Sequence, residues 1–207
     1  MEKIAITIGR SYGSNGSEIG KKLASRLDIP FYDKEIIEEQ VKKSGFTGEY
    51  IKSFDEKKTS SLLYSIFMNP ESIMLQSGFG QTQPIDMAIQ KVQIETIREI
   101  ADKGPCVIVG RRADKILKDN YETFSVFITA EADARVAFVA QNENLSPKDA
   151  ETKINRMDRS RRSYYNYYGD GTWGDASNYD LCINTSKVSI DSAVEMVITY
   201  LKSKKLV

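Results

Sequence analysis

A short apolar run followed by a glycine-rich loop constrains the fold of this 207-residue chain more than any other feature. Residues 4–8 read Ile-Ala-Ile-Thr-Ile, a β-branched run typical of a strand buried on both faces of a parallel sheet. Gly9, Gly13 and Gly16 punctuate the loop that follows, and Ser17 is placed to open a helix with apolar residues at helical spacing. Strand, glycine loop and helix in this order predict the first βα unit of an α/β domain.

Apolar strands and amphipathic helices alternate along most of the remaining chain. Further strands are predicted at about 31–32, 106–110, 124–128 and 180–184, and helices at about 33–41, 85–102, 131–141, 146–168 and 189–201. This alternation predicts an α/β fold of three layers, with helices on both faces of a parallel sheet. We expect a single domain over residues 1–207, with a helical insert at about 44–84, where glycines and prolines interrupt scattered apolar residues.

Composition excludes several classes of function. Lys and Arg number 29, as do Asp and Glu, so the formal net charge is zero and no global field favours nucleic acid or an anionic membrane. The chain has no histidine, which excludes Ser-His-Asp and Cys-His catalysis and argues strongly against a zinc site. Cys106 and Cys182 lie in apolar runs and are expected to be buried, reduced thiols. Neither a signal-peptide pattern nor an apolar run of about 20 residues is found, so we expect a cytoplasmic protein.

The glycine-rich loop has the features of an anion site. Glycines let the backbone turn tightly and aim successive N–H groups inward, and the next helix adds the positive end of its dipole. The sequence therefore predicts a phosphate cradle formed by Gly13, Ser14, Asn15, Gly16 and Ser17. Its spacing departs from G-x-x-x-x-G-K-[ST], because Gly16 stands at the lysine position when Ser17 is set at the hydroxyl position that binds Mg²⁺. An ordinary βα turn is the alternative interpretation.

Three blocks of the sequence resemble the cytidylate kinase-like family, whose members are relatives of the bacterial nucleoside monophosphate kinases. The blocks are ITIGRSYGSNGSEIGKKLASRLDIPFYDKEII near the start, VIVGRRADKIL at 107–117 and YYNYYGDGTWGDASNYDLCINTS at 164–186. The resemblance implies a P-loop NTPase-type three-layer α/β/α fold. It also implies ATP as phosphoryl donor, Mg²⁺ as cofactor and a small phosphate-bearing acceptor such as CMP.

Arg111 follows the clearest buried strand, at the sheet edge where open α/β folds bind their ligands. An arginine can grip a phosphate there with two parallel hydrogen bonds. The matching segment of cytidylate kinases reads D-G-R-D, and its arginine holds the phosphate of the acceptor, so the resemblance assigns that role to Arg111. Val109 and Arg112 replace the two flanking acids. The alternative is a surface arginine paired with Asp114.

A basic stripe marks the helix predicted after residue 146. Its members, spaced by three, are Lys153, Arg156, Arg159 and Arg162. The stripe resembles the arginine-bearing helical lid of nucleoside monophosphate kinases, here at about 146–176, whose arginines stabilise the transferring phosphoryl group. Arg161 is expected to lie off the stripe, and Asp158 is placed to orient one of the arginines. A solvated basic helix face is the alternative.

Other polar and aromatic residues carry weaker signals. Asp33 follows the short strand at 31–32; the resemblance places it on the acceptor-binding side, while a helix cap is the simpler role. The tyrosines at 164–168 and Trp173 could stack on bases, but packing of the lid helix onto the domain is the favoured interpretation.

The leading hypothesis is a nucleotide-binding kinase that transfers the γ-phosphoryl group of ATP to a nucleoside monophosphate such as CMP. Ser17 would bind Mg²⁺, and Arg10 or Lys21 would replace the absent loop lysine. The absent lysine also favours a second hypothesis, a nucleotide sensor with little or no turnover. A third hypothesis, a nucleic-acid or partner-binding protein using the basic stripe and the tyrosines, is disfavoured by the neutral net charge. The oligomeric state is not indicated.

Overall fold

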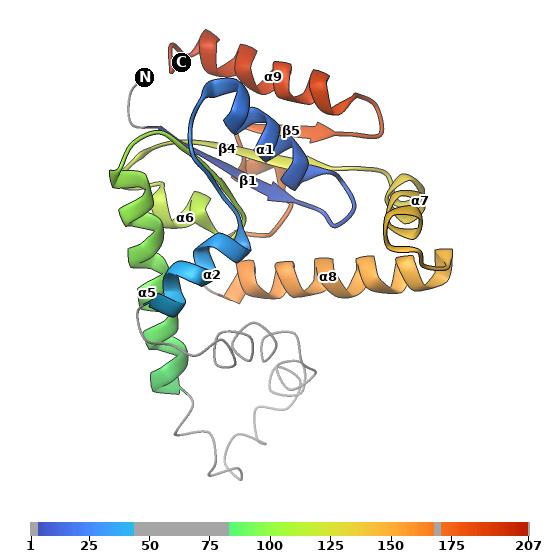
Figure 1. Cartoon of the computed structure of the whole chain (residues 1–207), viewed down its shortest axis with the longest axis horizontal. Coiled ribbons are helices and arrows are strands. Elements are labelled where there is room, and N and C mark those ends of the chain that lie inside the picture. Colours follow the sequence, from blue (N-terminus) through green and yellow to red (C-terminus); the bar gives the residue numbers. More distant parts are fainter. Residues whose placement is uncertain (1–3, 44–82, 168–170, 207) are drawn as a thin grey trace.

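A computed structural model describes residues 4–43, 83–167 and 171–206 of the chain (Figure 1). The strands are β1 (Ile4–Arg10), β2 (Phe31–Tyr32), β3 (Cys106–Val109), β4 (Glu122–Thr129) and β5 (Leu181–Asn184). The helices are α1 (Gly16–Leu27), α2 (Lys34–Lys43), α5 (Gln83–Asp102), α6 (Ala113–Leu117), α7 (Ala132–Glu143), α8 (Pro147–Tyr167) and α9 (Ile190–Ser203), with a 3₁₀ turn, η3, at Ala176–Asn178. The insert predicted at about 44–84 falls almost entirely outside the described residues.

The strands form one parallel sheet in the order β2-β3-β1-β4-β5. β1 is central, and its Ile6 lies opposite Val107 of β3 and Phe124 of β4. The predicted three-layer α/β fold with a parallel sheet is therefore confirmed. Because every strand runs in the same direction, the loops that follow β1, β3 and β4 meet at one edge of the sheet.

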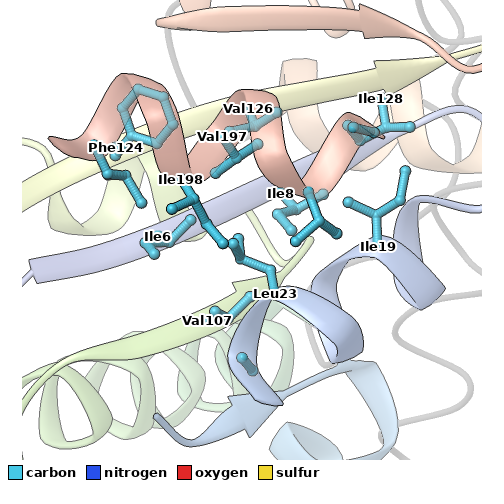
Figure 2. Packing of buried hydrophobic residues seen from close by; sticks show 14 of the residues in the cluster. Ile6, Ile8, Ile19, Leu23, Val107, Phe124, Val126, Ile128, Val197 and Ile198 are labelled. Carbon is cyan, nitrogen blue, oxygen red and sulfur yellow. The ribbon is translucent and has the colours of Figure 1, made fainter. Parts of the chain in front are cut away.

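Helices cover both faces of the sheet, with α1 and α9 on one side and α5 and α6 on the other (Figure 1). Alternation along β1 divides its side chains between two cores: Ile6 and Ile8 join the α1–α9 side, and Ala5 joins the α5–α6 side. Figure 2 shows the first core, where Ile19 and Leu23 of α1 approach the side chains of β1. Burying each large aliphatic side chain contributes about 1.5–3 kcal/mol, so these cores hold the sheet edge in place.

The helix starts follow local capping chemistry. The backbone N–H of Asp149 donates to the Ser146 hydroxyl at 3.2 Å, and that hydroxyl donates to the Asp149 carboxylate at 2.6 Å, as the sequence predicts for α8. The backbone N–H of Ile36 donates to Asp33 Oδ1 at 3.1 Å, so Asp33 caps α2. α1 begins at Gly16 rather than Ser17, because Asn15 in the left-handed region (φ 59°) ends the loop.

One expectation from the sequence is wrong, and one element was not predicted. Cys182 is exposed, because β5 is an edge strand and Cys182 points away from the core while its neighbour Ile183 points inward. The five-residue helix α6 was not expected, since a segment this short has no measurable apolar periodicity. Across the described residues, no helix combines the length and the apolar character that crossing a bilayer requires.

Candidate phosphate-binding site

Hydrogen bonds to β4 and to the residue after β5 hold the glycine loop between β1 and α1 in place. The backbone N–H of Ser11 donates to the carbonyl of Ile128 at 2.9 Å. The buried Ser14 hydroxyl lies within hydrogen-bonding distance of two carbonyls, those of Ser11 at 2.8 Å and Ile128 at 3.1 Å. Thr185, just after β5, donates its hydroxyl to the Ser14 carbonyl at 3.1 Å. These bonds fix the shape of the loop without using the N–H groups of its second half.

The second half of the loop presents unused donors. Within the described part of the chain, the backbone N–H groups of residues 13–17 donate to no protein acceptor. Gly13 has φ 78° and Asn15 has φ 59°, left-handed conformations that turn successive N–H groups toward a common side. The same donors include the first turn of α1, where the helix dipole favours an anion. This arrangement fits a phosphate group, and the exposed Ser17 hydroxyl on that turn fits a Mg²⁺ ligand.

Arg10 lies beside this loop rather than in solvent. A Cβ atom built on Gly16 would be 2.5 Å from Cβ of Arg10, and Nη1 of Arg10 lies against Gly110 at the end of β3. Burial, followed by the nearby charges of Arg161 and Arg111, lowers the pKa of the Arg10 guanidinium to about 9. Arg10 is therefore still charged at neutral pH, in a site where its charge is costly.

Four arginines surround one small cavity at the carboxyl ends of β1 and β3. The cavity has a volume of about 50 Å³, and its basic lining residues are Arg10, Arg111, Arg112 and Arg161. Asp114 also lines it, accepts a hydrogen bond from the Tyr165 hydroxyl at 2.6 Å, and has its pKa raised by burial. The described lining thus contains four cations and one acid, so positive charge is concentrated here although the whole chain is neutral.

Arg111 sits on a strained backbone. Gly110, Arg111 and Arg112 have φ of 80°, 54° and 55°, and non-glycine residues in the left-handed region typically cost about 1–3 kcal/mol each. The Arg111 side chain is 6% exposed and forms an ion pair with Glu38 of α2, and its guanidinium lies 5.6 Å from the centre of the Tyr164 ring. The expected alternative, a surface arginine paired with Asp114, does not describe it.

Asp158 connects α8 to the loop. Its Oδ1 accepts the backbone N–H of Tyr12 at 2.7 Å, and its Oδ2 accepts Nη1 of Arg135 from α7 at 2.6 Å. Arg161 donates to the carbonyl of Arg10 at 2.9 Å and lies 5.3 Å from the centre of the Tyr12 ring. The structure thus places Arg135 and Arg161 beside the loop, and sequence reasoning missed both of them.

The basic stripe of α8 does not face the loop as a whole. Arg156, Arg159 and Arg162 are exposed, and the Arg162 guanidinium lies 5.7 Å from the centre of the Trp173 ring. Lys153 forms an ion pair with Glu143 of α7. Three residues advance a helix by about 300°, so a stripe at this spacing drifts by about 60° per step and cannot keep one face.

A different stripe of α8 points inward. Its members at heptad-like spacing are Ala150, Ile154, Asp158, Arg161 and Tyr165; the three uncharged members are buried, and the two charged members reach the loop. Two charged residues on an otherwise apolar stripe are a sequence signal that would have identified Asp158 and Arg161.

The remaining candidates lie around the same edge. Asp33 caps α2, and its charge is close enough to counter the lowering of the Arg10 pKa, as is that of Glu35. Tyr164 donates its hydroxyl to Gln93 of α5, so this tyrosine packs α8 onto the domain, as favoured from the sequence. Lys21 is exposed, with its ammonium 5.9 Å from the centre of the Phe31 ring, and does not line the cavity.

Comparison with known proteins agrees with this geometry. Residues 5–187 match the cytidylate kinase-like family. The chain belongs to this family. It is 28% identical over 198 residues to a cytidylate kinase of Pyrococcus horikoshii, a match that covers 95% of this chain and 87% of that protein. A cytidylate kinase of Pyrococcus furiosus is 28% identical over 196 residues, covering 94% and 86% of the two chains.

Solved structures extend the likeness to three dimensions. An uncharacterized protein from Eubacterium ventriosum superposes with a TM-score of 0.73 and 32% identity, over 97% of this chain and 99% of that one. A Thermus thermophilus protein superposes with a TM-score of 0.54 at 14% identity, which shows a shared fold alone. Membership of this family supports a nucleotide kinase.

Proposed function

We propose that this member of the cytidylate kinase-like family transfers the γ-phosphoryl group of ATP to a nucleoside monophosphate such as CMP. The observation that carries the proposal is the meeting of two anion-binding features at one sheet edge. Unused N–H groups of the loop at 13–17 lie next to a cavity lined by four arginines. Phosphoryl transfer needs positioning and charge stabilisation of this kind, with little covalent help from the protein.

The loop and the arginines would divide the two nucleotides between them. The N–H groups of Gly13, Ser14, Asn15, Gly16 and Ser17 would hold the donor phosphates. Arg111 would hold the phosphate of the acceptor from the far side of the cavity, with Asp33 nearby at the start of α2. Glu38 pairs with Arg111 in this structure, so acceptor binding would exchange one anionic partner of this arginine for another.

The chemical step is an in-line displacement. An oxygen of the acceptor phosphate forms a bond to the γ-phosphorus while the bond from that phosphorus to the β–γ bridging oxygen breaks, which leaves ADP. Arg161, which has Asp158 at 3.9 Å, would neutralise charge on the transferring group, and Arg135, which pairs with the same Asp158, would assist it. Arg156, Arg159 and Arg162 are further candidates for this role on the exposed side of α8.

Magnesium fits the same edge through the Ser17 hydroxyl, which lies on the first turn of α1. When bound, Mg²⁺ supplies charge neutralisation to the phosphates of the donor. The part of this chain would be to present that hydroxyl from the first turn of α1, beside the N–H groups that would hold the phosphates.

One observation favours a second function, a nucleotide sensor with little turnover. Gly16 stands where the phosphate-loop signature has a lysine, and that lysine reaches the β- and γ-phosphates. A chain without it could keep the phosphate cradle and lose the rate acceleration. The two functions differ in turnover, not in binding.

One experiment separates them. ATP and a panel of nucleoside monophosphates, with CMP first, are titrated into the protein by calorimetry, and ADP formation is then measured for each pair that binds. A kinase binds ATP and an acceptor and forms ADP only when both are present. Tight ATP binding without ADP formation for any acceptor would replace the kinase by the sensor, and absence of ATP binding would contradict both.

A further inference from the structure

Gly16 and Arg10 compete for the same space. A Cβ atom on Gly16 would lie 2.5 Å from Cβ and 3.1 Å from Cγ of Arg10, closer than side chains approach without a shift. The remainder of the Arg10 side chain continues past Gly16 to Gly110, so its guanidinium lies at the carboxyl end of β3. With this backbone, a lysine at position 16 and an arginine at position 10 exclude each other.

The Arg10 guanidinium has an unusual environment for a cation. The residue is partly buried, and within the described part of the chain it makes no ion pair and its guanidinium donates no hydrogen bond to the protein. Beyond the effect of burial, the charges of Arg161 and Arg111 lower its pKa more than the opposing charges of Glu35 and Asp33 raise it. A desolvated cation among like charges is costly unless an anion joins it. Among the described residues, the Arg10 guanidinium is therefore available to an anionic ligand.

We propose that Arg10 supplies, from the end of β1, the phosphate-directed charge that phosphate loops otherwise take from a lysine at position 16. This inference rests on the proposed function, because it needs a nucleoside triphosphate in the loop. The cavity that Arg10 lines is also lined by Arg111. Arg10 therefore lies between the donor phosphates on the loop and the acceptor phosphate on Arg111, where the transferring group passes. Lys21, the other candidate in the sequence, points to the Phe31 ring instead.

The first test is a set of calorimetric titrations with ATP, ADP and AMP. Arg10→Met should weaken ATP binding about tenfold to a hundredfold, since hydrogen bonds to charged groups are worth that much. The loss should shrink for ADP and nearly vanish for AMP, because Arg10 is expected to contact the outer phosphates. Lys21→Met is the matched control and should leave all three affinities unchanged. The inference would be overturned if Lys21→Met lost ATP affinity while Arg10→Met did not, or if Arg10→Met lost as much affinity for AMP as for ATP.

The second test moves the charge back to the signature position. Arg10→Gly removes both the charge and the Cβ that blocks position 16, and Arg10→Gly with Gly16→Lys then restores a cation there. The double variant should bind ATP at least about fivefold more tightly than Arg10→Gly alone. Circular dichroism checks that both variants fold. If Arg10→Met fails to fold, this pair decides, and absence of recovery overturns the inference.

The outcomes also separate this inference from the proposed function. A wild-type protein that binds no ATP would contradict the proposed function and the role of Arg10 with it. A wild-type protein that binds ATP, with Arg10→Met binding equally well, would leave the function standing and remove Arg10 from it.

Discussion

Replacing Asp158 with asparagine tests whether charge holds α8 against the glycine loop. Asp158 accepts the Tyr12 backbone N–H at 2.7 Å and Arg135 Nη1 at 2.6 Å, and its side chain is 14% exposed. Asparagine has the same shape, but it has one acceptor oxygen, and its amide NH₂ group would face one of the two donors, the Tyr12 N–H or Arg135 Nη1. One hydrogen bond to a charged group is lost, which is worth about 1.5–3 kcal/mol, and the remaining bond weakens. The free energy of unfolding should therefore fall by about 2–4 kcal/mol.

The same substitution should act on nucleotide binding in the opposite direction. Asp158 partly neutralises Arg135 and Arg161, the two arginines beside the loop. Its removal raises the positive potential that meets the ATP phosphates, so affinity should rise or stay equal. Turnover should fall, because Arg161 loses its orienting partner.

Urea unfolding and ATP calorimetry on one preparation measure both effects. Asp119→Asn is the matched control, since Asp119 is exposed in the turn after α6, and both quantities should stay unchanged there. A loss of unfolding free energy below about 0.5 kcal/mol, the range of ordinary surface substitutions, would refute the docking role of Asp158. A tenfold loss of ATP affinity would show instead that Asp158 supports the ligand directly.

Three further predictions concern individual side chains. Arg111→Lys should weaken acceptor binding by about 1–3 kcal/mol and leave donor binding nearly unchanged in calorimetry, because lysine lacks the planar fork; equal loss of both ligands would contradict this. Arg161→Ala should lower turnover at least about tenfold, roughly 1.4 kcal/mol of barrier. Arg156→Ala or Arg159→Ala should lower turnover less, because these two side chains are exposed. The reverse order in steady-state assays would return the catalytic role to the exposed stripe. Hydrogen bonds from Lys153 and then Tyr12 lower the pKa of Glu143. The stabilising contribution of the Glu143 carboxylate is therefore present above the ordinary glutamate pKa of about 4.3 and is lost as pH falls through the lowered value. The free energy of unfolding of Glu143→Gln should depend less on pH in acid than that of the wild type. Parallel pH profiles of the two proteins would contradict the stabilising role of the Glu143 hydrogen bonds.

Most of the fold could be predicted because its signals are local. β1 and β3 are continuous β-branched runs, and the start of α8 has a Ser-x-x-Asp box, so both strand burial and helix starts follow from neighbouring residues. The prediction that Cys182 is buried fails for a non-local reason, because the exposure of this side chain depends on β5 being the last strand of the sheet. Strand order is set by tertiary packing, which periodicity does not encode.

The candidate site was predicted in outline and missed in detail. The loop and Arg111 are marked by glycine spacing and by position after a strand, which are local features. The choice between Arg161 and the stripe of Arg156, Arg159 and Arg162 depends on which face of α8 packs inward, and the apolar positions of that helix decide it. The direction of Arg10 depends on the space beside Gly16, which only the folded backbone defines.

If phosphates bind as proposed, the charges around the cavity would limit how tightly they are held. Two carboxylates already contact these arginines. Asp158 of α8 pairs with Arg135 of α7 and lies 3.9 Å from Arg161 of its own helix, and Glu38 of α2 pairs with Arg111. Incoming phosphates would compete with these carboxylates for the same guanidinium groups, so the gain on binding is the difference between two charge-assisted contacts and not the whole of one. Arg10 has no such protein partner among the described residues, and its interaction with a phosphate is opposed by no exchange of this kind. A ligand that reaches Arg10 should therefore gain more than one that stops at the rim of the cavity, which makes the outer phosphates of a triphosphate the part of the nucleotide that this site would distinguish best.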